Sequence, residues 1–153
     1  MRRLYHFPLS PFCRKVRLVL GEKKLDFQPV VERPWEKRAE FLSLNPAGQV
    51  PVLAESKNLI VSDSTAITEY LEELHPDPPL LPRRPAERAE ARRLAGWFDQ
   101  IFFAGVTAVI LREKLLKRYD MTEAPDPDIA ALRTSFDALR RHQEGAVASE
   151  LAA

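Results

Sequence analysis

The apolar and polar positions of the chain follow two different patterns on either side of a proline-rich stretch. Before this stretch, short apolar runs bounded by turn residues alternate with helical stripes. The patterns predict strands at 3–7, 27–31, 50–54 and 59–62, and helices at 11–24, at 36–44 and from 63 or 64 onward. Strand, helix, strand followed by strand, strand, helix predicts a small mixed sheet with helices packed on it. The expected core residues are Leu4, Val16, Leu20, Val52, Ile67 and Leu71.

Residues 76–85 are the predicted linker between two domains, since 75–85 holds five prolines between two helical patterns. The domains are then 1–75 and a helical region at 86–153. In the helical region, 86–118 predicts one long helix with a bend near Gly105, and 126–142 predicts a second helix. The longest uninterrupted apolar run, 101–111, is too short to cross a bilayer.

Composition and charge narrow the function classes. The 23 Lys and Arg residues balance 22 Asp and Glu residues, which gives no reason to expect nucleic acid or a membrane as partner. The single cysteine excludes an internal disulfide. The first 13 residues contain no apolar stretch long enough for a signal peptide, so we expect a cytoplasmic protein. The three histidines lie far apart without other ligands at metal-binding spacing, and we expect no metal site.

A first motif, Ser10-Pro11-Phe12-Cys13, lies where a strand leads into a helix. Redox proteins of this architecture carry a Cys-x-x-Cys pair here, because backbone N–H groups and the helix dipole stabilise a thiolate. With Ser10 in the first position a dithiol cycle is impossible. The Ser10 hydroxyl either stabilises a thiolate that a substrate supplies or only caps the helix. Cys13 is expected to be a buried, inert thiol.

Two further motifs could hold a peptide-like ligand. In Asn45-Pro46-Ala47-Gly48-Gln49-Val50-Pro51, a proline enters a strand after a tight turn, which predicts a cis Val50–Pro51 bond or an ordinary turn. In Asp63-Ser64-Thr65, a helix begins with a group that binds an α-amino-acid end or acts only as an N-cap. The ligand interpretation uses Asp63 for an ammonium group and Ser64 for a carboxylate.

The order and spacing of these three motifs within the first 70 residues resemble the glutathione transferase superfamily. The resemblance implies a thioredoxin-like α/β N-terminal domain followed by an all-α C-terminal domain, homodimers, and glutathione as co-substrate with no other cofactor. It assigns Ser10 to thiol activation. It assigns the glutathione backbone and γ-glutamyl end to Gln49, Val50, Pro51, Asp63 and Ser64.

Segments outside these motifs, at 32–38, 69–73, 76–82 and 92–99, resemble the FzlA-like, FtsZ-binding transferase homologues of alphaproteobacteria. That resemblance implies an FtsZ-type filament protein of cell division as partner. Trp35 lies among charged residues, and it either lies in the glutathione cleft or anchors a partner protein. Residues 143–153 resemble neither group, and we expect a truncated helical domain.

Two functions from different classes therefore follow from the sequence. In the first, the protein is a glutathione transferase that conjugates the glutathione thiol to an electrophile, with Ser10 as catalytic residue. In the second, it is a catalytically silent module that binds FtsZ. The retained cleft residues favour the first function, and the FzlA-like segments favour the second.

Overall fold

A computed structural model describes residues 1–55 and 59–112 of the chain. The chain forms two compact units, Met1–Arg88 and Ala89–Ala153, and each is described by itself. The helix predicted at 126–142 lies outside the described residues, as does the end of the helix predicted at 86–118.

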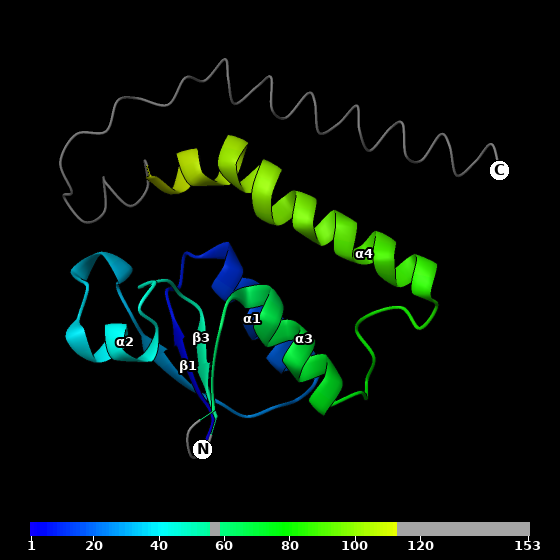
Figure 1. The fold of residues 1–153 in the computed structure, drawn as a ribbon, viewed down its shortest axis with the longest axis horizontal. Helices are drawn as coiled ribbons and strands as arrows, with labels where there is room; N and C mark the ends of the chain where they lie inside the picture. Colours follow the sequence, from blue (N-terminus) through cyan, green and yellow to red (C-terminus); the bar gives the residue numbers. More distant parts are fainter. Residues whose placement is uncertain (56–58, 113–153) are drawn as a thin grey trace. The chain divides into compact units, whose positions relative to one another are not determined.

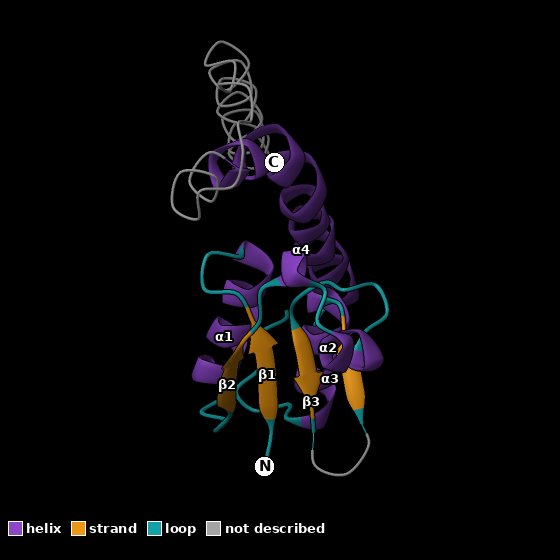
Figure 2. Cartoon of the chain, turned by 90° about the vertical axis from the view of Figure 1, so that its left-hand side faces the viewer, coloured by secondary structure: helices purple, strands orange, loops and turns teal. Residues whose placement is uncertain are grey.

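The first unit is built on a four-stranded sheet in the order β2-β1-β3-β4. β1 pairs in parallel with β2 and antiparallel with β3, and β3 pairs antiparallel with β4. Figure 2 shows β1 and β3 running in opposite directions at the centre of the sheet. The strands are β1 Arg3–His6, β2 Gln28–Val31, β3 Val52–Ala54 and β4 Ile60–Ser62.

Helices cover both faces of this sheet. Figure 1 shows α1 and α3 side by side on one face and α2 on the other. The bounds are α1 Pro11–Glu22, α2 Ala39–Leu44 and α3 Ser64–Leu74, with a short 3₁₀ helix, η1, at Pro34–Glu36. The predicted mixed α/β sheet is confirmed.

The core of this unit lies between the sheet and the helix pair α1 and α3. Its fully buried cluster consists of Leu4, Val16, Leu20, Leu53, Ile67 and Leu71. The predicted core residue Val52 is also fully buried. Burying a side chain of this size stabilises the fold by about 1.5–3 kcal/mol, so this cluster fixes the helices on the sheet.

The helix predicted at 36–44 is wrong in its first three residues. Pro34–Glu36 forms η1, and Lys37 then adopts a left-handed conformation with φ 47° before α2 begins at Ala39. The Arg38 guanidinium donates to the buried Glu32 carboxylate at 2.7 Å and 3.2 Å. This pairing fixes the turn between β2 and α2, a tertiary interaction that helical periodicity does not contain.

The second unit is described only in its first helix. α4, Pro85–Trp97, starts at the end of the first unit and continues into η2, Phe98–Thr107, which has π-helical hydrogen bonds. Trp97, Phe98 and Phe102 pack together, with ring centroids 5.1–6.3 Å apart.

This continuous helix is longer than the apolar run at 101–111, which is too short to cross a bilayer. Pro85–Arg112 is long and apolar enough, by length and composition alone, to cross a bilayer. The core helix of a soluble protein passes the same test, and this helix includes Asp99. Length and composition therefore do not favour a membrane over a protein environment.

Candidate functional site

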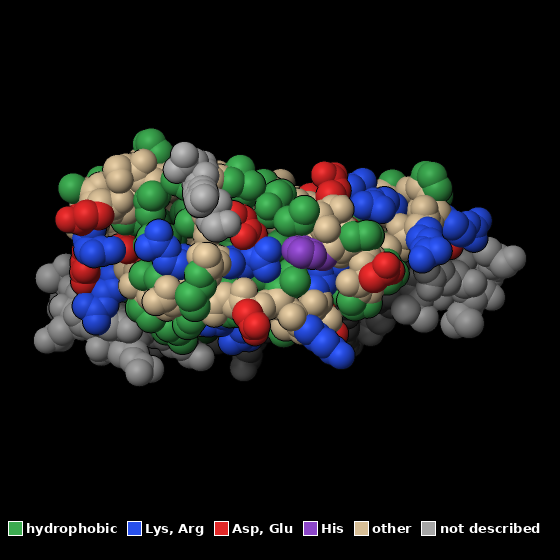
Figure 3. Space-filling view, turned by 90° about the horizontal axis from the view of Figure 1, so that it is seen from below, with side chains coloured by type: hydrophobic (Ala, Val, Ile, Leu, Met, Phe, Trp, Pro, Cys, Tyr) green, Lys and Arg blue, Asp and Glu red, His purple; other side chains and the backbone are tan. Residues whose placement is uncertain are grey.

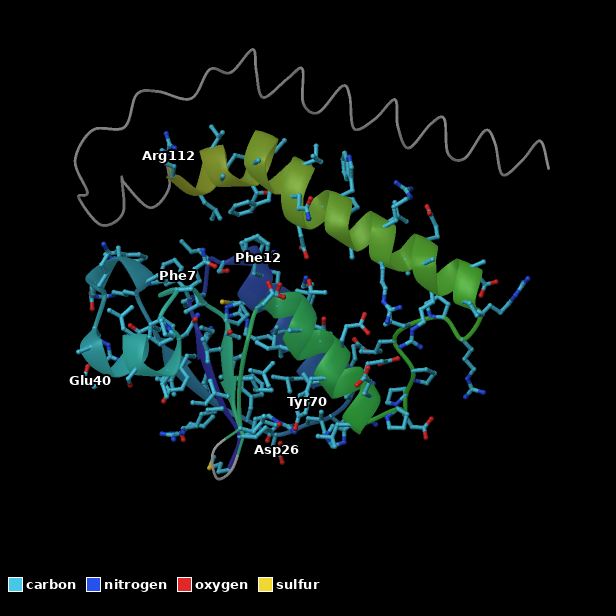
Figure 4. The ribbon with its side chains drawn as sticks, in the orientation of Figure 1. Phe7, Phe12, Asp26, Glu40, Tyr70 and Arg112 are labelled. Carbon is cyan, nitrogen blue, oxygen red and sulfur yellow. The ribbon has the colours of Figure 1, made fainter. Side chains whose placement is uncertain are left out.

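The strand register brings the three predicted motifs to one end of the sheet. Val52 lies opposite Tyr5 on one side and opposite Ser62 on the other. Neighbouring strands are about 4.8 Å apart. The residues just before Val52, just after Ser62 and just after β1 therefore share one edge. Figure 4 labels Phe7 and Phe12 at this end of the domain, and Asp26 at the opposite end.

Ser10 caps α1 at this edge. Its Oγ accepts a hydrogen bond from the Cys13 N–H at 3.3 Å, and Pro11 occupies the first helical position. Capping and thiol activation are compatible, because a hydroxyl has one donor hydrogen besides its two acceptor lone pairs. The capping role is confirmed, and the catalytic role stays a prediction.

Cys13 is fully buried behind Ser10, as expected. Its Sγ accepts from the Phe7 backbone N–H at 3.4 Å. Burial raises the pKa of the Cys13 thiol above its ordinary value, and hydrogen bonds from Ser10 and the Phe7 backbone do not offset it. The thiol therefore stays protonated and unreactive at neutral pH.

Asp63 and Ser64 form the start of α3. Asp63 Oδ1 accepts from the Thr65 and Ala66 N–H groups at 2.8 Å and 3.0 Å. Of the described residues, none donates to Asp63 Oδ2 and none accepts from the Ser64 N–H. One carboxylate oxygen and one helix N–H are thus left for a ligand, fewer donors than an uncapped helix N-terminus offers.

Asp63 has an unusual backbone. Its φ of 77° and ψ of 129° lie in a region that residues other than glycine rarely occupy. This conformation places the carboxylate over its own helix terminus. This backbone conformation costs free energy, and the surrounding structure holds it in place at the sheet edge where the three motifs meet.

Pro51 is buried and joined to Val50 by a cis peptide bond, as predicted. Within the described part of the chain, the Val50 N–H donates no hydrogen bond and the Val50 C=O accepts none. Asn45 shapes the preceding loop, since its Nδ2 donates to the Gln49 carbonyl at 2.9 Å. The Gln49 side chain is exposed.

Trp35 is half-buried in η1 and lies edge-on to Phe7, with ring centroids 5.0 Å apart and an interplanar angle of 83°. The Phe7 backbone carbonyl accepts a hydrogen bond from the Ser10 backbone N–H at 3.1 Å. The Trp35 ring therefore packs beside the segment that carries Ser10. This placement supports the cleft interpretation of Trp35, while a partner role stays a prediction.

Sequence reasoning missed two residues that support the site. Lys15 Nζ donates to Thr65 Oγ1 at 3.3 Å and joins the first turns of α1 and α3. Glu32 is only 1% exposed and forms an ion pair with Arg38. This pair holds the loop in which Trp35 lies. Lys15 and Thr65 lie 50 positions apart in the sequence, so no local pattern could have signalled their contact. Arg38 and Glu32 are only six positions apart, and a buried acidic residue after a strand could have signalled that pair.

Charge on the surface is mixed. Figure 3 shows Lys and Arg side chains interspersed with acidic and hydrophobic ones on the face it presents. Across the described ranges, no three His, Cys, Asp or Glu residues are grouped so that they could hold a metal ion.

Comparison with known proteins decides the family. Residues 4–79 match the family described as glutathione S-transferase, N-terminal domain. Residues 4–79 are a glutathione S-transferase N-terminal domain. The match ends before α4, so it covers the sheet, α1 to α3 and every site residue predicted from the three motifs.

Relatives of this transferase domain extend the similarity into α4. FtsZ-localized protein A of Caulobacter vibrioides is 51% identical over 144 residues, which are 92% of this chain and 62% of that protein. The solved structure of FzlA from C. crescentus aligns with a TM-score of 0.81 at 52% identity, covering 92% of this chain and 63% of that one.

A glutathione S-transferase structure from Rhodospirillum rubrum F11 aligns with a TM-score of 0.81 at 48% identity, covering 93% of this chain and 63% of that one. The chain thus spans less than two thirds of the length of each of these relatives. The fold class and the family of the transferase domain are established by these matches.

Proposed function

We propose that the transferase domain binds glutathione at the sheet edge formed by Ser10, Val50 and Ser64 and activates its thiol for conjugation to an electrophile. The observation that carries this proposal is the strand register, which brings the three motifs together at Val52 in a domain of this family. Separate motifs could each be a simple cap or turn, whereas their convergence matches one extended peptide ligand.

The available groups suit the parts of glutathione. Asp63 Oδ2 would accept from the γ-glutamyl ammonium, and the Ser64 N–H and hydroxyl would donate to its carboxylate. The N–H and C=O of Val50 would pair with the cysteinyl backbone, as a strand partner does. Gln49 and Pro51 would border the glycyl-cysteinyl backbone. Each group is supplied by the protein without breaking a hydrogen bond.

Ser10 would act on the thiol. The glutathione thiol would lose its proton to water, and the thiolate would accept a hydrogen bond from the Ser10 hydroxyl. The thiolate would then form a sulfur–carbon bond with an electrophilic carbon, as a leaving group departs with its bonding electron pair or as the electrons of a π bond move to a neighbouring atom that takes a proton from water. A hydrogen bond to a charged group is worth about 1.5–3 kcal/mol. At about 1.4 kcal/mol per pKa unit, this bond would lower the thiol pKa by about one to two units from about 8.5.

A second candidate function is binding to FtsZ in cell division. It is supported by the 51% identity with FtsZ-localized protein A, which extends over 92% of this chain. In this case the partner would contact Trp35, or other surface residues, and the glutathione groups would have no chemical role. We further propose a cytoplasmic homodimer, in keeping with the free buried thiol of Cys13.

Calorimetric titration with glutathione tests the first function, and co-sedimentation with FtsZ filaments tests the second. We expect glutathione to bind, and the ultraviolet absorbance of its bound thiolate to titrate about one to two pKa units higher in the Ser10→Ala variant. The Ser43→Ala variant is the matched control, because Ser43 hydrogen-bonds only its own helix, at the Glu40 carbonyl.

Absence of glutathione binding to the unmutated protein would contradict the first function. Co-sedimentation in that case would leave the FtsZ-binding module as the function. Binding of glutathione with an unshifted thiol pKa would contradict the role of Ser10 alone.

A further inference from the structure

Lys23, the C-cap residue that follows α1, is a buried cation that donates hydrogen bonds to the segment after α3. The Lys23 side chain is fully buried, and its Nζ lies 2.7 Å from Glu72 Oε2. The same Nζ donates to the backbone carbonyls of His75 at 2.6 Å and Pro78 at 2.9 Å. An ammonium group has three donor hydrogens, and all three are therefore used.

Glu72, on the last turns of α3, completes the arrangement from the other side. Its Oε1 accepts from the backbone N–H groups of Leu80 at 3.0 Å and Leu81 at 3.1 Å. The carboxylate is 9% exposed. One ion pair thus supplies hydrogen bonds to four backbone positions between residues 75 and 81.

These bonds replace the secondary structure that this segment lacks. Residues 75–82 form no helix or strand, and Pro76, Pro78, Pro79 and Pro82 have no N–H to donate. A chain of this composition has few means to hold itself against a domain. A buried ion pair by itself is weak evidence for stability, but this one satisfies carbonyl and N–H groups that no neighbouring strand reaches.

We propose that Lys23 and Glu72 form a clamp that holds residues 75–81 on the transferase domain. The fixed segment follows α3 and precedes α4 (Figure 1). The clamp thereby fixes the first part of the connection predicted at 76–85. The clamp shares no residue with the proposed glutathione site.

Amide hydrogen exchange in the full chain tests the clamp. The main variant replaces Lys23→Met and Glu72→Met together, because well-packed apolar residues of similar size usually leave a buried pair site stable. We expect exchange at Leu80 and Leu81 to accelerate on the order of 100-fold relative to the core amide of Leu53. The Lys23→Met single variant should show the same local change, with some loss of core protection.

Arg33→Met is the matched control, because the Arg33–Glu36 pair lies in the same unit at 2.9 Å but is exposed on both sides. It should leave Leu80 and Leu81 protected. Unchanged protection of these two amides in the double variant would overturn the clamp, since their own packing would then hold the segment. Equal acceleration of Leu53, Leu80 and Leu81 would overturn it as well, because the pair would then serve global stability alone.

Discussion

The backbone of Asp63 gives a prediction in which glycine and alanine reverse their usual order of stability. Asp63 has φ 77° and ψ 129° and caps α3 through Oδ1. A non-glycine residue in such a region costs about 1–3 kcal/mol. The Asp63→Gly variant removes this cost, and it loses the cap at a cost of a few tenths of a kcal/mol. The greater freedom of glycine in the unfolded chain costs a further 0.5–1 kcal/mol or so.

The Asp63→Ala variant keeps the strained backbone and loses the cap, which costs about 1 kcal/mol. Summing these contributions, Asp63→Gly should be roughly equal to the unmutated protein or up to about 2 kcal/mol more stable. It should exceed Asp63→Ala by about 2 kcal/mol. In an ordinary helix or strand interior the alanine variant would be the more stable by about 0.5–1 kcal/mol.

Urea unfolding measures this difference. A Trp97→Phe background leaves Trp35 as the one tryptophan, and Trp35 lies in the first unit with Asp63. Its fluorescence then reports the unfolding free energy of the transferase domain alone. An Asp63→Ala variant as stable as Asp63→Gly would refute the reasoning, because the backbone at Asp63 would then carry no strain. If glutathione binds as proposed, both variants should also lose affinity for it, since both lack the carboxylate.

Three further outcomes are expected. Burial would raise the pKa of Glu72, but hydrogen bonds from Lys23 and two backbone N–H groups outweigh it and lower the pKa below its ordinary value. The stabilisation by Glu72 is then complete above that ordinary value and lost as pH falls through the lowered pKa, so unfolding free energy should drop below about pH 4, and less steeply in Glu72→Gln. In glutathione titrations, Ser64→Ala should lose about 1.5–3 kcal/mol and Cys13→Ala far less, and equal losses would contradict the site. Leu94, Phe98 and Ile101 are 39%, 43% and 61% exposed, so light scattering should detect association, and a monomer that binds no hydrophobic dye would refute this expectation.

The sequence by itself determined the features that depend on neighbouring residues. Ser10 with Pro11, and Asp63 before an apolar stripe, mark helix starts because capping satisfies N–H groups within one turn of the chain. The alternation of apolar runs predicted the strands to within two residues, and the core positions Leu4, Val16, Leu20, Ile67 and Leu71 are all fully buried. The cis Val50–Pro51 bond is one of the two alternatives that the local pattern left open.

Only the tertiary structure decided which hydrogen-bond and ion-pair partners the capping and charged side chains take. That Asp63 caps α3 through one carboxylate oxygen depends on its backbone angles, which no pattern of residue types contains. That Lys23 pairs with Glu72, 49 positions later by their residue numbers, depends on α1 and α3 packing side by side. Local sequence specifies which bonds a residue is able to make, whereas the packed fold decides which partner comes within reach. Both the proposed site and the proposed clamp depend on which partners the packed fold brings within reach.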